Sequence, residues 1–218
     1  MLRRRVVITG AGTVTPFGEG LDPLWNGLRE GRSTLAPIQS FDASGFDCQL
    51  AGEVPPIKVK DRVPKSYRKA IKVMARDIEL AVVAAAAAIE HAGLVTKPGA
   101  DQGNSLTYPP GRVGCQIGAG LIAANLSELA EAMNASAKAE GSFTYQGWGQ
   151  GGMNNLTPLW MLKYLPNMLA CHVTIIHDAK GPSNTITCGE ASGLLSIGES
   201  MRVIERSDAD AAFAGGAE

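Results

Sequence analysis

The sequence predicts an α/β protein built on a parallel β-sheet that helices cover on both faces. Short apolar or β-branched runs of strand length recur along the chain, and Ser183–Thr187 is one of them. Segments of helical spacing follow such runs, as Leu194, Ile197 and Met201 do here. Glycines stand at most of the junctions. Because parallel strands need a long crossover, strands that alternate with helices indicate a sheet with helices on both sides.

The first third of the chain begins with a predicted strand and ends in an irregular region. Arg5–Thr9 is β-branched and runs into Gly10-Ala11-Gly12, which indicates a buried strand entering a tight turn. Leu21–Leu28 is predicted to be a helix. The prolines and polar residues of Gly31–Pro64 predict a long surface excursion with little regular structure.

A long helix is predicted from Lys65 to His91, where strong helix formers dominate. Ala92-Gly93-Leu94 then supplies the glycine that commonly follows a helix end. Within this helix, Ala81–Ala88 is small and apolar on every face, so we expect neighbours to approach it closely on more than one side.

The remaining elements continue the alternation of strands and helices. In order, they are a loop over 96–110, a strand over Gly111–Gly118, a helix over Leu121–Lys138, a glycine-rich loop over Gly147–Asn155, helices over Pro158–Leu165 and Asn167–Cys171, strands over Val173–Ile176 and Ser183–Thr187, a helix through Ile204, a turn over Asp208–Asp210 and a strand over Ala211–Ala214.

Composition excludes several classes of protein. The 218 residues are 45% hydrophobic with a net charge of −1, which argues against disorder and against a nucleic-acid platform. The longest apolar run, Leu80–Ile89, is far shorter than a membrane span. The basic start has too short an apolar run for a signal peptide, so we expect a cytoplasmic protein.

No pattern indicates a metal or another cofactor. The four cysteines (Cys48, Cys115, Cys171, Cys188) form no C-x-x-C pair, and structural disulfides are not expected in a reducing compartment. His172 and His177 are interpreted as structural histidines with satisfied hydrogen bonds. No histidine or carboxylate cluster has the spacing of a metal site.

Two familiar motifs are incomplete. Gly10-Ala11-Gly12 after a strand could open a dinucleotide-binding turn, but Thr15 stands where the third glycine belongs. A serine-hydrolase elbow would need serine two residues after Gly189, and Ala191 stands there. Because two glycines of the dinucleotide-binding motif are present, an NAD(P)-binding oxidoreductase is kept as an alternative function.

The sharpest local pattern is the strand, turn and helix over Thr185–Gly193. Such a turn places a side chain at a helix amino terminus, near free N–H groups and the positive end of the helix dipole. Glu190 takes this place, with Cys188 two residues earlier. The simplest interpretation is that Glu190 complements the dipole, which contributes roughly 0.3–1 kcal/mol.

The same segment resembles the active-site region of β-ketoacyl-acyl-carrier-protein synthases. The resemblance extends to RRVVITGAGTVTPFG at 4–18, LWNGLREGRS at 24–33, Arg112–Gly120, Pro166-Asn167-Met168 and the segment 207–218. It implies the thiolase-like α/β/α/β/α sandwich, with residues 1–218 as the amino-terminal half. We therefore expect a chain that behaves as a fragment, oligomeric or poorly soluble when expressed alone.

The resemblance also implies a function. Members of the family transfer an acyl group from a carrier-protein thioester to a cysteine and then condense it with a decarboxylated malonyl group. Counting from Gly181, that cysteine is the tenth residue of the motif, which is Glu190 here. The family's decarboxylation histidines belong to the other half. The interpretation is a divergent, chain-length-factor-like member without the nucleophile; the alternative is an acyltransferase that uses unconventional residues, Cys188 among them.

The resemblance further implies an acyl pocket and partners. Leu121 and Trp160 align with apolar positions along the growing chain, although both would equally suit a core. The implied partners are an acyl carrier protein and a second chain, in a homodimer or in a heterodimer with a ketosynthase.

Overall fold

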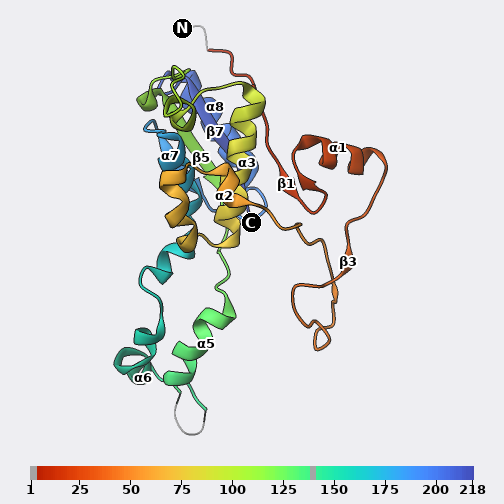
Figure 1. Ribbon diagram of the computed structural model, residues 1–218, viewed down its shortest axis with the longest axis vertical. Coiled ribbons are helices and arrows are strands. Elements are labelled where there is room, and N and C mark those ends of the chain that lie inside the picture. The colour runs from red at the N-terminus through yellow and green to blue at the C-terminus, as the bar shows by residue number, and fades with distance from the viewer. Residues whose placement is uncertain (1–3, 138–140) are drawn as a thin grey trace.

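A three-stranded parallel sheet forms the centre of the chain in a computed structural model that describes residues 4–137 and 141–218. Its strands are β5 (Val113–Gly118), β6 (Ser183–Ile186) and β7 (Ala211–Gly216), in the order β6-β5-β7. Helices α3 (Arg76–Ala92) and α7 (Met168–His177) lie on one side of the sheet. Helix α8 (Ser192–Glu205) covers the other side, as Figure 1 shows. The predicted α/β class is confirmed.

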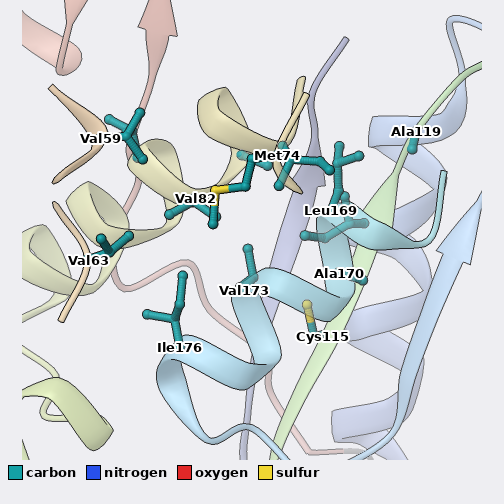
Figure 2. Close-up of a cluster of buried hydrophobic side chains, with 14 of the residues drawn as sticks. Val59, Val63, Met74, Val82, Cys115, Ala119, Leu169, Ala170, Val173 and Ile176 are labelled. Carbon is teal, nitrogen blue, oxygen red and sulfur yellow. The ribbon is translucent and has the colours of Figure 1, made fainter. Parts of the chain in front are cut away.

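The hydrophobic core lies between the sheet and the pair α3 and α7. Figure 2 shows the α7 side chains directed toward the sheet and α3. The buried positions of α7 recur at helical spacing, and burial of each large side chain contributes roughly 1.5–3 kcal/mol. The members of this core that these three elements contribute include Ile78, Val82 and Val83 from α3, Leu169, Val173 and Ile176 from α7, and Cys115 and Ile117 from β5.

Helix α8 contacts the sheet through small polar residues. Ser192, Ser196 and Ser200 recur every fourth residue and are all buried. The other face of α8 carries large apolar side chains that remain exposed (Leu194, Leu195, Ile197, Met201). This uncovered face is consistent with the expectation that the chain alone associates or is poorly soluble, which stays a prediction.

The other elements are short. They are β1 (Val14–Thr15), β2 (Gly18–Glu19), α1 (Leu21–Arg29), β3 (Ala36–Pro37), β4 (Leu50–Ala51), α2 (Val59–Arg62), η1 (Lys65–Val73), α4 (Lys97–Ala100), η2 (Pro110–Arg112), α5 (Leu126–Ala135), α6 (Tyr145–Gln150), η3 (Gly152–Asn155) and η4 (Trp160–Lys163), where η marks 3₁₀ helices. Helix α1 and the sparse structure over Gly31–Pro64 agree with prediction.

The predicted strand at Arg5–Thr9 is wrong. This segment has no ladder partner in the described ranges, and Val7 and Ile8 are 66% and 82% exposed. A strand needs a neighbouring backbone, and β7 pairs only with β5 among the described strands. The chain instead runs past α3, where Gly10 and Gly12 allow close approach: an added Cβ would lie 2.5 Å from the Ala88 carbonyl oxygen and 2.2 Å from that of Ala84. The close approach to the alanine-rich helix was predicted correctly.

The predicted helix from Lys65 to His91 is divided in two. Residues Lys65–Val73 form the 3₁₀ helix η1, and the chain becomes extended at Met74 and Ala75 before α3 begins. The end of α3 agrees with prediction, because Gly93 adopts the left-handed conformation at φ 64°.

The predicted strand at Val173–Ile176 is also wrong, since α7 runs unbroken through it. Its β-branched residues suggest a strand, but Leu169, Val173 and Ile176 share one helical face in the core. Packing of that face overrides the local preference.

An arm between β5 and α7 extends away from the sheet in Figure 1 and carries α5 and α6. The predicted helix over Leu121–Lys138 is shorter, covering Leu126–Ala135, and Lys138 lies outside the described residues. The predicted loop at Gly147–Asn155 is wrong, because it contains the end of α6 and all of η3. The predicted helix at Pro158–Leu165 is reduced to η4, after Leu159 at φ 65°.

Candidate active site

The turn between β6 and α8 lies at the carboxyl ends of the parallel strands. It begins after Ile186, passes through Gly189 at φ 53° and ends where α8 starts at Ser192. The Ser192 hydroxyl accepts a hydrogen bond from the Cys188 N–H at 2.8 Å and donates one to the Gly189 carbonyl oxygen at 2.6 Å. These bonds hold the turn in place. The cap residue Ala191 cannot do so, because its methyl group forms no hydrogen bond.

Glu190 lies in this turn, two residues before the first residue of α8, and its side chain is exposed. Within the described part of the chain, no hydrogen bond or ion pair to its carboxylate is found. The sequence therefore placed Glu190 correctly beside a helix amino terminus. A carboxylate there interacts favourably with the helix dipole.

Cys188 is exposed in the same turn, and it is one of four free cysteines. Its N–H is held by Ser192, so the backbone here is ordered by the helix that follows. In the described ranges, no histidine or lysine side chain forms a hydrogen bond with Cys188 or with Glu190.

Glycines let α8 approach the ends of the strands. A Cβ on Gly118 would lie 2.4 Å from the Ser192 carbonyl carbon, and one on Gly216 would lie 3.4 Å from the Gly193 Cα. The Ser196 hydroxyl adds a bond from the Gly215 N–H at 3.1 Å. The sequence analysis did not single out these glycines as part of the site, although two strands that each end in glycine were a readable signal.

Leu121 and Trp160 lie apart in the structure. Leu121 follows the end of β5 and is 85% exposed, whereas Trp160 is half-buried in the arm. Neither the cavity beside His177 nor the one beside Arg62 is lined by Leu121, Trp160 or Glu190. The acyl-pocket roles of Leu121 and Trp160 stay predictions.

Trp160 belongs to a polar cluster that ties the arm together. Its ring lies 4.9 Å from that of Tyr164, whose hydroxyl donates to Glu128 at 2.8 Å. Lys163 pairs with the same carboxylate at 2.6 Å, and this bond is the main reason that the pKa of Glu128 is lowered. The cluster holds α5 against η4.

His172 and His177 are buried in α7 and each uses one ring nitrogen. Nδ1 of His172 lies 2.8 Å from the Tyr67 hydroxyl, and Nδ1 of His177 lies 2.8 Å from the Thr96 hydroxyl. Burial lowers the pKa of both, that of His177 to about 4. The expectation of fully satisfied histidines is wrong in one respect: in the described chain, Nε2 of each is buried without a partner.

A basic surface on η1 was missed. Lys65, Arg68, Lys69 and Lys72 are exposed, and none of them takes part in the ion pairs found within the described ranges. The signal was readable, because basic residues greatly outnumber acidic ones over 58–72. η1 is anchored beneath this surface by the contact of Tyr67 with His172.

Two further properties concern the described residues only. No group of three or more histidine, cysteine or carboxylate side chains there is arranged to hold a metal ion. No helix in these ranges combines the length and hydropathy needed to cross a bilayer.

Comparison with known proteins connects this geometry with a family. The profile of the β-ketoacyl synthase N-terminal domain matches residues 3–218. Proteins named 3-oxoacyl-[acyl-carrier-protein] synthase 2 from Coxiella burnetii and Vibrio harveyi are 34% and 31% identical over the whole chain. The chain spans about half of their length, 46% in each case.

A solved structure shows the same similarity. The ishigamide ketosynthase/chain length factor superposes with a TM-score of 0.73 at 26% identity, covering 99% of this chain and 48% of that one.

Proposed function

Because the chain belongs to the β-ketoacyl synthase family through its N-terminal domain, we propose that it is a non-condensing member that pairs with an active ketosynthase, as a chain length factor does. The observation that carries this proposal is Glu190. It occupies the turn before α8 where the resemblance places the nucleophilic cysteine, and its carboxylate is exposed.

The chemistry of a carboxylate disfavours acyl transfer at this position. Attack of Glu190 on a thioester would form a mixed anhydride and release the carrier thiolate. Water would hydrolyse that anhydride and return the free carboxylate and a fatty acid, so no acyl group would remain for condensation. A thiolate avoids this loss because its acyl thioester is stable enough to await the second substrate.

The outer edge of β6 supplies a surface for the partner chain. The Cys115 N–H donates to Pro182 and the Ala119 N–H donates to Ile186, so alternate residues of β6 face β5. The backbone of Ser183 and Thr185 therefore faces outward, away from β5. An open strand edge is a template for a strand of another chain. The comparison with a protein named ketosynthase/chain length factor supports a heterodimer.

The basic surface on η1 suits the other expected partner. A carrier protein presents its acyl group on phosphopantetheine, which contains a phosphodiester, and exposed lysine and arginine side chains attract that charge. After the extended residues Met74 and Ala75, η1 is followed by α3, whose first turn contains Asp77. The pKa of Asp77 is raised by burial and by the nearby Glu218, which follows the end of β7. The amino terminus of α3, which follows η1, thus lies near the end of β7.

The test is acylation followed by mass spectrometry. The full-length protein is incubated with an acyl-carrier-protein thioester, and intact mass and peptide mapping locate any adduct. We expect no adduct on the native protein, none in Glu190→Gln, and an adduct on residue 190 in Glu190→Cys. An active homologue is labelled in parallel. A stable adduct on Glu190 or Cys188 of the native protein would replace the proposal with the alternative, an acyltransferase of unconventional chemistry.

The remaining alternative, an NAD(P)-binding oxidoreductase, has lost its structural basis. Gly10 and Gly12 are explained by their contact with the backbone of α3, and no strand lies in the described residues 4–9 that precede them. Measurable NAD(P) binding would revive it.

A further inference from the structure

The hairpin formed by β3 and β4 carries two exposed aromatic rings at its tip. Phe41 and Phe46 are 54% and 60% exposed, and their ring centroids lie 5.8 Å apart in an edge-to-face arrangement. The hairpin lies well apart from α2 and α3 in Figure 1, so these helices do not cover the rings. Exposed apolar groups that gather at one place commonly mark an interaction surface.

Each of the two phenylalanines is followed by an aspartate. Phe41-Asp42 and Phe46-Asp47 stand at the two ends of the segment FDASGFD, and both aspartates are exposed. Neither of them takes part in the ion pairs found within the described ranges. Aromatic rings attract cations through their faces, and carboxylates bind them through charge-assisted hydrogen bonds. The tip is therefore suited to a surface of lysine and arginine side chains.

The tip is held in shape by its own hydrogen bonds. The Ser44 N–H donates to Oδ1 of Asp42 at 3.0 Å, and the Phe46 N–H donates to the Ala43 carbonyl oxygen at 3.0 Å. The bonds from Ser44 lower the pKa of Asp42, so this carboxylate is charged at neutral pH. Because the tip is already ordered, little conformational freedom is lost when a partner binds to it.

Among the described residues, the basic surface on η1 has the complementary chemistry. The segment 58–72 contains seven lysines and arginines and one acidic residue. Tyr67, Ala70 and Ile71 are half-buried, so the exposed basic side chains of η1 share its outward side. Because η1 contacts α2, from which the hairpin lies well apart in Figure 1, the two surfaces do not meet within one chain.

We propose that the tip of this hairpin, residues 41–47, docks on η1 of a second copy of the chain. The alkyl stems of the basic side chains pack on Phe41 and Phe46, and their charges face Asp42 and Asp47. The net charge of a chain is only −1, so two copies attract each other at these surfaces without strong repulsion elsewhere. The contact does not rest on the function proposed above, and it leaves the outer edge of β6 free.

The test reverses the charge of each surface in turn and measures self-association of the full-length protein by sedimentation at low salt. One variant combines Asp42→Lys with Asp47→Lys. The other combines Lys65→Glu, Lys69→Glu and Lys72→Glu. Each variant alone brings like charges together, so we expect at least about a tenfold rise in the Kd of self-association. An equimolar mixture of the two variants brings opposite charges together again and should recover most of the native affinity.

A matched control separates docking from a general effect of charge. Glu131→Lys with Glu205→Lys makes the same change of net charge as the hairpin variant, on α5 and α8, at carboxylates outside the ion pairs found in the described ranges. We expect the native Kd for this control. Circular dichroism checks that every variant keeps the native fold.

The native protein supplies a measurement that needs no variant to fold. Its self-association should weaken as salt is raised, because the contact joins exposed charges. The proposal fails if the native protein does not self-associate or does so independently of salt. It also fails if the hairpin variant associates as tightly as the native protein, if the control weakens as much as the hairpin variant, or if the mixture of folded variants recovers no affinity.

Discussion

The Ser192 hydroxyl accepts a hydrogen bond from the Cys188 N–H at 2.8 Å, so the first residue of α8 holds the turn that contains Glu190. Ser192 is buried, and the same hydroxyl donates to the Gly189 carbonyl oxygen. The position of Glu190 is thus set by the residue two places after it. A buried side chain of the helix, and not the exposed carboxylate, keeps the turn in shape.

Ser192→Ala should therefore destabilise the chain. It leaves the Cys188 N–H and the Gly189 carbonyl without this partner, which predicts a loss of about 1–3 kcal/mol in the free energy of unfolding, measured with urea. Ser200→Ala is the control, because its hydroxyl lies 3.5 Å from the Phe213 carbonyl oxygen and should matter less. Equal effects of the two variants would show that the turn does not depend on Ser192.

Two glycine variants should behave in opposite ways. Gly118→Ala places a methyl group 2.4 Å from the Ser192 carbonyl carbon, so α8 must move away from the sheet. We expect a loss of more than about 2 kcal/mol or failure to fold. Gly198→Ala, within α8, meets nothing within 4 Å and should stabilise the helix by about 0.5–1 kcal/mol. Thermal unfolding of both variants checks the difference, and a neutral Gly118→Ala would contradict it.

Local sequence patterns predicted the secondary structure correctly where a segment packs against an element that is close to it in the sequence. The strand Ser183–Ile186 and the helix after it were found from periodicity, because each packs against the other through a short turn. Val173–Ile176 was misread because its helical form depends on a core assembled from α3 and β5. Arg5–Thr9 was misread for the opposite reason, since strand formation needs a neighbour that the described chain does not supply.

The candidate site was found only in part. Glu190 was identified from the strand, turn and helix pattern, and the resemblance then assigned it the position of the family's cysteine. The structure was needed to show that its side chain is exposed. Leu121 and Trp160 could not be joined into a pocket from sequence, because Trp160 belongs to an arm whose position is set by contacts such as the Lys163–Glu128 pair. The basic surface on η1 was readable as a run of charges, but its exposure was not.

Stability should fall in mild acid because of His177. Burial lowers its pKa from 6.5 to about 4, so the folded chain binds the proton less readily than the unfolded chain does. The contribution is complete above about pH 6.5 and is lost as the pH falls toward 4, by up to about 3 kcal/mol. His172 acts in the same direction. Urea unfolding between pH 4 and 7 checks this, and His177→Leu should flatten the dependence; an unchanged slope would contradict it.

Reversal of charge on η1 should weaken binding of the carrier protein. Lys65→Glu combined with Lys69→Glu replaces two exposed cations by anions, and we expect at least about a tenfold rise in Kd at low salt, with a smaller effect at high salt. Calorimetry with a phosphopantetheinylated carrier protein measures it. Arg29→Glu on α1, also exposed, is the control. Equal loss in the control would indicate a general charge effect and no docking on η1.

A proline at the outer edge of β6 should separate the chain from its partner without unfolding it. The Thr185 N–H faces away from β5 and is bonded only locally, to Oδ1 of Asn184 at 2.9 Å. Thr185→Pro removes this N–H while the bonds of β6 to β5 remain, because proline is tolerated on an edge strand whose N–H faces outward. Thr185→Ala keeps the N–H and is the matched control. Sedimentation with a ketosynthase should show a complex with Thr185→Ala and free chains with Thr185→Pro, while circular dichroism reports the same fold for both. A complex that survives in Thr185→Pro would move the partner surface away from β6.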